Sequence, residues 1–191
     1  MPTDLLFNGG IGTYVKAQGE SNAEVGDIAN AAVRVNASEL RARVVGEGGN
    51  LGFTQRARVE LALAGGRINT DAIDNSAGVD TSDHEVNLKI ALQPLVAAGT
   101  MTGEERNALL QDLAEDVAAL VLAHNRAQSR AISRDQHRSE TRLVDFREMM
   151  ADLEATGLLD RALEGLPDRD ALRARRSTAR GLARPELAVL L

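Results

Sequence analysis

Apolar and polar positions alternate over short distances in the first 80 residues of the chain. Short apolar runs bounded by polar or glycine-rich stretches predict strands of four or five residues. The candidate strands are residues 4–7 (DLLF), residues 42–45 (ARVV), and either residues 66–70 (GRINT) or residues 70–73 (TDAI). The pattern therefore predicts three short strands in this part of the chain.

Helical periodicity occupies the intervals between these strands. Residues 21–35 predict a helix that is capped by Ser21 or Asn22, with acidic residues near its start. Residues 54–66 predict a second helix, which begins at Thr54 and ends at a pair of glycines able to adopt the left-handed conformation. We expect both helices to connect neighbouring strands.

Strands that alternate with helices are typical of parallel sheets with right-handed crossovers. Three strands make only half of a doubly wound sheet and leave an open edge, which tends to pair with another strand. The predicted fold class is therefore α/β, with a partial doubly wound, Rossmann-like parallel sheet in the N-terminal half. An all-α helical segment is expected to follow it.

From residue 83 onward the apolar positions follow a helical period. A capping box, Thr102 to Glu105, marks the start of one helix, and Pro185 lies near the start of another. The predicted helices cover residues 83–99, 105–128, 140–155, 158–167 and 184–191.

Two regions follow from this change of pattern. Residues 1–95 are expected to form the C-terminal half of a dinucleotide-binding domain, and residues 96–191 a helical domain. Twelve of the 17 glycines lie in residues 1–80, which supports a division between a loop-rich and a helical part. Because the sequence ends within an apolar run, we expect the helical domain to be truncated at its C-terminus.

A glycine-rich segment, residues 46–50 (GEGGN), follows the second predicted strand. Ligands of open α/β sheets bind outside the carboxyl ends of strands, where glycines let a ligand approach main-chain N–H groups. Asn50 adds a carboxamide that can pair with another amide or with a ribose hydroxyl. A tight strand-to-helix connection explains the same residues without a ligand, and both interpretations stay open. The glycine spacing differs from the dinucleotide-binding fingerprint.

A second polar stretch, residues 74–85 (DNSAGVDTSDHE), follows the third predicted strand. Residues 74–82 are expected to form a turn, in which the Asn75 amide can face the same crevice as Asn50. Ser82 leads into a predicted helix, and capping alone accounts for a serine there. A hydroxyl at a helix start can also bind a substrate carboxylate.

We expect no metal site in this stretch. Its metal-capable side chains lack the second histidine, four residues on, that a zinc-binding helix needs. His84 is therefore expected to be a packed or surface histidine, and neither His124 nor His137 has the sequence context of a catalytic triad. The metal-capable residues are Asp80, Asp83, His84 and Glu85.

Composition narrows the class of protein further. A net charge of −6 argues against a nucleic-acid-binding surface along the whole chain, and the lack of cysteine excludes disulfides and thiolate metal sites. We see neither a secretory signal nor a run of apolar residues long enough to span a membrane, so a cytoplasmic location is expected. Five arginines between Arg173 and Arg184 predict a solvated helical face, with a regulatory anion or protein contact as the alternative.

Three blocks of the sequence resemble the large bacterial NAD-specific glutamate dehydrogenases. They lie in order and nearly abut, so the resemblance covers residues 3–95, and the helical remainder is similar to the segment that follows in those enzymes. The blocks are DLLFNGGIGTYVKA, RVVGEGGNLGFTQRARVE and INTDAIDNSAGVDTSDHEVN.

The resemblance implies roles for three side chains. The smaller glutamate dehydrogenases carry an EGAN pattern that matches the segment ending at Asn50, and an NAGGVxxS pattern that matches residues 75–82. Carried over, Asn50 and Asn75 contact the nicotinamide side of the cofactor, and Ser82 binds the substrate's side-chain carboxylate. Glycine replaces the alanine of the first pattern at Gly49, a small-for-small exchange.

The resemblance adds Gly9 and Gly10 as backbone contacts to the cofactor, since NGGIGT lies where the small enzymes have a loop beside it. The residues of that loop differ from the family pattern. The implied cofactor is NAD, and the implied substrates are L-glutamate and 2-oxoglutarate. A homo-oligomer is implied for the full-length enzyme, without nucleic acid or membrane as a partner.

The implied reaction is oxidative deamination of L-glutamate to 2-oxoglutarate and ammonia, with hydride transfer to NAD. The family places the catalytic lysine, the proton-transferring carboxylate and the phosphate-binding glycine loop upstream of these blocks. Lys16 and Lys89 do not match the lysine motif, so we expect no catalytic residue in this chain and no turnover by the chain alone. The alternative is a stand-alone regulatory or interaction module derived from the dehydrogenase.

Overall fold

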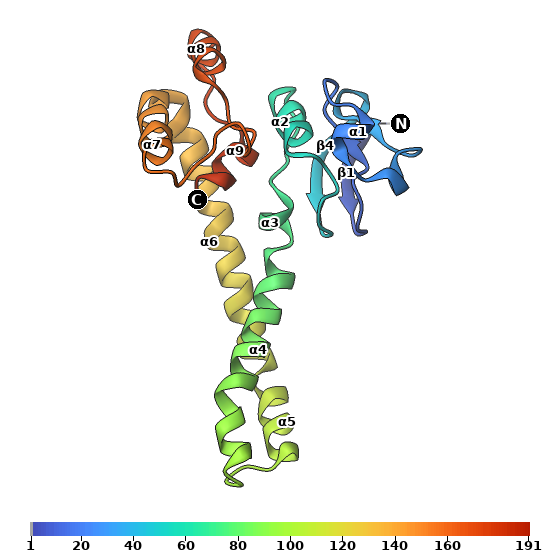
Figure 1. The fold of residues 1–191 in the computed structure, drawn as a ribbon, viewed down its shortest axis with the longest axis vertical. Helices are drawn as coiled ribbons and strands as arrows, with labels where there is room; N and C mark the ends of the chain where they lie inside the picture. The colour runs from blue at the N-terminus through green and yellow to red at the C-terminus, as the bar shows by residue number, and fades with distance from the viewer. Residues whose placement is uncertain (1) are drawn as a thin grey trace.

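The N-terminal lobe is built around short parallel strands, as Figure 1 shows for the computed structural model, which describes residues 2–191. Strand β1 (Thr3–Asn8) pairs in parallel with β4 (Ala42–Glu47), and their carboxyl ends lie together, with Asn8 opposite Glu47. A second pair joins β2 (Val15–Lys16) to β3 (Val35–Asn36), also in parallel. The first two predicted strands are therefore confirmed.

The third predicted strand is reduced to a single bridge. Arg67 forms this bridge with Val44 of β4. The alternative segment, residues 70–73, lies instead at the start of the short helix α3 (Asp71–Asp74). The protein is thus a mixed α/β structure with a small parallel sheet, followed by helices. The doubly wound, Rossmann-like arrangement stays a prediction.

The helix predicted for residues 21–35 is wrong. Ser21 does cap a helix, through a capping box with Glu24, but α1 spans only Asn22–Val25. Gly26 ends it with a φ of 78°, a conformation that costs glycine little. Two 3-10 turns follow, η1 (Ile28–Asn30) before β3 and η2 (Ala37–Glu39) after it.

Helix α2 (Gln55–Leu63) follows the prediction closely. The Thr54 side chain accepts a hydrogen bond from the Ala57 N–H, which satisfies one of the free donors of the first turn. Gly65 adopts a φ of 100° just after the helix, as expected of a glycine in that place.

A long arm extends from this lobe (Figure 1). It contains α4 (Ser76–Ala97), α5 (Gly103–Asp112) and the first part of α6 (Ala114–Thr141). The turn predicted for residues 74–82 is wrong, because helix α4 begins at Ser76 and packs along α6. Tertiary packing here outweighs the weak helix propensity of the small and β-branched residues.

Local sequence signals predict only some of the helix ends in the arm. The capping box of Thr102 and Glu105 is confirmed at the start of α5. The single helix predicted for residues 105–128 is instead two helices, which meet at Leu113. The predicted domain boundary at residue 95 lies in the last turns of α4, and the division into two domains stays a prediction.

The C-terminal head consists of helices α7 (Leu143–Ala155), α8 (Arg169–Ser177) and α9 (Arg184–Val189) around the end of α6. The first and the last were predicted, and Pro185 does lie in the first turn of α9. The helix predicted for residues 158–167 is wrong. The Asp160 carboxylate instead accepts two successive backbone N–H groups and holds a turn.

Two separate hydrophobic cores stabilise the N-terminal lobe and the C-terminal head. The core of the N-terminal lobe contains Val15, Ala37, Val45, Phe53, Ala57, Leu61 and Ile68. The core of the C-terminal head contains Ile73, Ile132, Leu143, Phe146, Met150, Leu166, Leu172, Leu182 and Leu187. Each large aliphatic side chain buried in this way contributes about 1.5–3 kcal/mol. Ile73 of α3 lies in the second core, so the N-terminal half of the chain is anchored in the C-terminal head.

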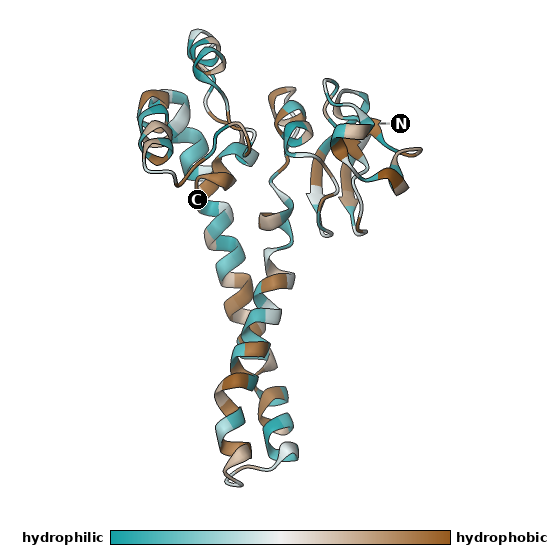
Figure 2. Cartoon of the chain, in the orientation of Figure 1, coloured by the Kyte–Doolittle hydropathy of each residue, from teal (hydrophilic) through white to brown (hydrophobic). Residues whose placement is uncertain are grey.

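The arm has little core of its own. None of the 22 residues of α4 is buried, and Val79, Val86 and Ile90 are each more than half exposed. Figure 2 shows brown, apolar positions repeated along the arm. Within residues 2–191, the helices all fall short of the length and apolar character that a membrane crossing requires.

Candidate functional site

Two glycine-rich loops meet at the carboxyl ends of β1 and β4. The Gly49 N–H donates to the Asn8 carbonyl at 3.0 Å, which joins the loop after β4 to the end of β1. A Cβ on Gly49 would lie 2.5 Å from the Gly10 carbonyl oxygen. Only glycine therefore lets the two loops approach this closely. Gly9 and Gly10 are exposed on the first of these loops.

Asn50 and Asn75 are brought together by different elements. Asn50 lies on the loop after β4, and Asn75 lies at the junction of α3 and α4. The Asn75 Nδ2 donates to the Asn50 Oδ1 at 2.8 Å. Gly78 leaves room for this arrangement, because a Cβ there would lie 2.6 Å from the Asn75 Oδ1. The structure thus brings the two amides together, and their contact with a cofactor stays a prediction.

The amide pair has a defined hydrogen-bonding character. One Asn75 N–H and one Asn50 oxygen lone pair are used within the pair. The Asn50 amide nitrogen keeps its donor capacity, and the Asn75 amide oxygen keeps its acceptor capacity. A carboxamide ligand carries the complementary acceptor and donor, so the pair has the chemistry to bind one.

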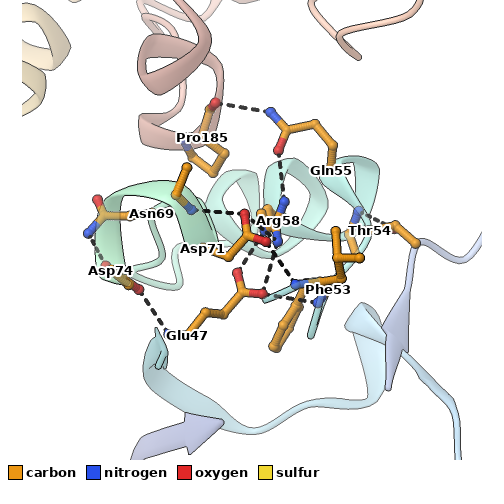
Figure 3. A network of polar contacts seen from close by, with 12 residues as sticks. Glu47, Phe53, Thr54, Gln55, Arg58, Asn69, Asp71, Asp74 and Pro185 are labelled. Carbon is orange, nitrogen blue, oxygen red and sulfur yellow. Dashed lines mark hydrogen bonds and ion pairs between the residues drawn. The ribbon is translucent and has the colours of Figure 1, made fainter. Parts of the chain in front are cut away.

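A buried ion pair fixes the loop that carries Asn50 (Figure 3). Glu47, at the end of β4, is completely buried, and its carboxylate accepts two hydrogen bonds from Arg58 at 2.7 and 2.9 Å. The same carboxylate accepts the Phe53 N–H at 3.1 Å. Both ends of the loop between β4 and α2 are therefore bound to one carboxylate.

Burial and charge have opposite effects on Glu47. Loss of hydration raises the pKa of this carboxyl above its usual value of 4.5, and the Arg58 guanidinium opposes that rise. Arg58 also contacts the Asp71 Oδ1 at 3.1 Å, so the two carboxylates share one guanidinium. A shared arginine keeps the buried charges paired.

Asp71 fixes the middle of the loop. Its Oδ2 accepts the N–H of Leu51, the residue directly after Asn50, at 2.8 Å. Leu51 has a φ of 62°, a left-handed conformation that is strained for leucine. Such strain persists where surrounding contacts hold the backbone, as the bond from Leu51 to Asp71 does here.

Asp74 links the site to the C-terminal head. Its carboxylate accepts the Glu47 N–H at 3.0 Å and the Asn69 Nδ2 at 2.7 Å. The Arg184 Nε donates in turn to the Asn69 Oδ1 at 2.7 Å, and burial lowers the pKa of this arginine. Arg184 and the buried Arg175 thus depart from the solvated face expected of the arginine-rich segment, whereas Arg173 is exposed.

The sequence pattern did not reveal these positioning residues. Glu47 was part of a glycine motif, and the partners Arg58, Asp71 and Asp74 lie at spacings without a recognisable motif. One signal was present. Arg58 lies three residues before the buried Leu61 of α2, so a charged side chain occupies the apolar face of that helix.

Asn8 was also missed. Its Nδ2 is buried and has no hydrogen-bond partner among the described residues. It lies against Gly52, where a Cβ would be 2.0 Å away. A buried amide without a partner is costly, so Asn8 is an unsatisfied donor at the end of β1.

Ser82 is exposed within α4 and does not cap a helix, so the alternative interpretation of Ser82 as an N-cap is wrong. It follows Asn75 by seven residues, about two helical turns, which puts it on nearly the same face of α4 at about 10 Å along the axis. Its role in binding a carboxylate stays a prediction.

The histidines of the arm lie in a setting that the sequence did not indicate. Asp80, His84 and His124 lie together, with His124 contributed by α6. The pattern of a zinc-binding helix places its second histidine four residues on in the same helix, whereas here the second histidine comes from α6, in a distant part of the chain.

The chain matches a family model described as "Bacterial NAD-glutamate dehydrogenase, catalytic domain" over residues 1–135. Among curated proteins it is 57% identical to the "NAD-specific glutamate dehydrogenase" of Pseudomonas aeruginosa and 52% identical to that of Mycobacterium tuberculosis, over 190 residues in each case. Identity to the protein of the same name from Halomonas elongata is 49% over 188 residues. These alignments cover 98–100% of this chain but only 12% of each relative.

Proposed function

The chain belongs to the bacterial NAD-glutamate dehydrogenase family, and on that premise we propose that it provides the nicotinamide-side part of the cofactor site of such an enzyme. The reaction is oxidative deamination of L-glutamate to 2-oxoglutarate and ammonia, with NAD as hydride acceptor. The relatives are named as NAD-specific enzymes of this kind. In this proposal the chain binds and orients the cofactor and the substrate.

The observation that carries the proposal is the hydrogen bond between Asn75 and Asn50. Nicotinamide ends in a carboxamide, and the pair retains one donor and one acceptor to receive it. The exposed backbone at Gly9 and Gly10 leaves room for a planar ring that approaches the strand ends. The residues present are therefore compatible with the cofactor.

Ser82 is assigned to the substrate. Its hydroxyl lies on nearly the same face of α4 as Asn75, two turns further along the helix. A glutamate side-chain carboxylate bound there would extend the amino acid toward the nicotinamide. Binding both molecules from one helix would fix the substrate relative to the ring, which is the positioning that hydride transfer needs.

The proposal assigns no catalytic residue to this chain. Deamination needs a lysine of lowered pKa and a proton-transferring carboxylate. Lys16 is hydrogen-bonded to Asn36, and Lys89 is paired with Glu85 on the surface of α4. We expect those groups, together with the phosphate-binding loop, to come from other parts of the enzyme, and the chain alone to have no activity.

Steady-state kinetics of the full enzyme tests the assignment. Asn50→Ala and Asn75→Ala are each expected to lower kcat/KM for NAD about tenfold or more, because each removes a hydrogen bond to the cofactor. Asn107→Ala, on the exposed helix α5, is the matched control. Unchanged kcat/KM in both site variants would contradict the proposal.

The location and assembly of the enzyme remain part of the proposal. We propose a cytoplasmic homo-oligomer, in keeping with the family resemblance. The alternative is a stand-alone regulatory module that pairs with the complete enzyme. An immunoblot of source cells against residues 100–191 distinguishes the two, since a band well above 20.4 kDa supports the enzyme and a band at 20.4 kDa supports the module.

A further inference from the structure

Three side chains from two helices of the arm converge beyond the candidate cofactor site. Asp80 and His84 lie one turn apart on α4, and His124 reaches them from α6. The Asp80 Oδ2 is 2.7 Å from the His124 Nδ1, and the Asp80 Oδ1 is 3.4 Å from the His84 Nε2. One ligand atom from each residue lies within 4.8 Å of the other two.

Hydrogen bonding within the group is incomplete. The His84 Nε2 is buried, and it lacks a hydrogen-bond partner among residues 2–191 even though the Asp80 carboxylate is near. The two imidazole rings are stacked, with centroids 5.9 Å apart and an angle of 24° between their planes. A buried ring nitrogen without a partner is unfavourable in a purely structural contact and suits a ligand atom.

We propose that Asp80, His84 and His124 bind a divalent transition-metal cation of the zinc type. Two imidazole nitrogens and one carboxylate oxygen form a borderline donor set, which suits Zn²⁺ better than Ca²⁺ or Mg²⁺. Bonds of about 2.0–2.1 Å to a tetrahedral ion place ligand atoms about 3.3 Å apart. The three ligand atoms reach that spacing through small side-chain rotations, which also open the short contact between Asp80 and His124.

The cation joins α4 to α6. The three side chains fill three of its four coordination positions, and water takes the fourth on the exposed side of the group. The His124 side chain is 53% exposed, so solvent reaches this side. Ser82 lies two residues from both Asp80 and His84, about 200° around α4 from each, so the metal and the proposed substrate contact occupy opposite faces. The bound ion would therefore hold the helix that carries Ser82 without obstructing it.

The chain offers a matched set of variants for a binding test. It contains three histidines, and the third, His137, lies on α6 with its side chain 85% exposed. Zn²⁺ titration of the tag-free chain against a chromophoric chelator is expected to show one site. His124→Ala and Asp80→Asn are expected to weaken binding at least about tenfold, and His137→Ala to leave it unchanged. Circular dichroism shows whether each variant is folded.

Imidazole NMR of the wild-type chain gives a second readout that needs no variant. On addition of Zn²⁺, the ring ¹⁵N signals of two histidines are expected to shift together at one equivalent, while the third stays in place. Absence of Zn²⁺ binding to the wild-type chain would overturn the proposal. So would a loss of affinity in His137→Ala equal to that in His124→Ala, or a shift of all three histidines in parallel.

Discussion

The N-terminal lobe and the C-terminal head are stabilised differently from the arm that extends from them (Figure 1). The lobe and the head each contain a buried arginine–glutamate pair eleven residues apart in sequence, Glu47 with Arg58 in the lobe and Arg175 with Glu186 in the head. Both pairs are bidentate. In the arm, the pair between Lys89 and Glu85 lies on the helix surface, with both side chains about half exposed.

Buried ion pairs fix loops in the lobe and the head, whereas the arm is a support made of helices. A buried pair is costly to break, because removal of one partner leaves the other charged and shielded from water. An exposed pair contributes little to stability. The Glu47 pair fixes the loop of Asn50, and the Glu186 carboxylate also accepts the Ala183 N–H at the start of α9. The arm depends instead on the packing of α4 against α6.

Loss of the Glu47 carboxylate should have the largest effect on stability. Glu47→Ala removes three hydrogen bonds and leaves Arg58 with Asp71 as its remaining carboxylate partner in this network. We expect the free energy of unfolding to fall by about 3–5 kcal/mol. Urea denaturation followed by far-UV circular dichroism measures it, since the chain lacks tryptophan.

Glu164→Ala is the control for this variant, because Glu164 is exposed in a turn. It is expected to leave the unfolding transition nearly unchanged. A loss of less than about 1 kcal/mol in Glu47→Ala would mean that the buried pair does not anchor the lobe, and that the contrast between lobe and arm is incorrect.

Arg175→Ala should have the next largest effect. Glu186 is 1% exposed, and without Arg175 its carboxylate keeps, among residues 2–191, only the Ala183 N–H as a partner. We expect the free energy of unfolding to fall by about 3 kcal/mol. Arg173→Ala, two residues away and exposed, is the control. Equal effects of the two changes in urea denaturation would remove the distinction between buried and exposed pairs.

Features that depend on neighbours in sequence were predicted well. Ser21, Thr54 and Thr102 cap helices as expected, and Pro185 lies in the first turn of α9, because caps act on groups within three or four residues. The glutamate dehydrogenase resemblance was confirmed for the same kind of reason, since it rests on continuous blocks of sequence.

Features that depend on distant contacts were missed. Helix α4 begins at Ser76 because it packs on α6, although its first residues resemble a turn. His124 meets Asp80 across 44 residues, and Asn69 meets Arg184 across 115. No local period encodes such pairs, so the anchors of the Asn50 loop and the histidine group became visible only in three dimensions.

Removal of one helix cap in the lobe and one in the arm should show the same contrast, with smaller changes in stability. Thr54→Ala is expected to lower the free energy of unfolding by about 1 kcal/mol, because α2 packs on the lobe's core. Thr102→Ala should fray the first turn of α5 with little effect on the global transition, since α5 has no buried residue. Hydrogen exchange of residues 103–106 and urea denaturation distinguish the two outcomes, and equal global losses would contradict the contrast.

The smallest expected effect concerns acid stability of the lobe. The Thr13 N–H and the Asn30 amide, each 2.8 Å from Asp27 Oδ2, lower the pKa of this carboxyl below 3.8. Because its folded pKa lies below its unfolded pKa, Asp27 adds stability above pH 3.8 that is lost as the pH falls through the folded value. Asp27→Asn should therefore be less stable than wild type at neutral pH, and the difference should shrink in acid. Carboxyl ¹³C titration measures the pKa directly, and a value at or above 3.8 would mean that Thr13 does not stabilise the ionised form.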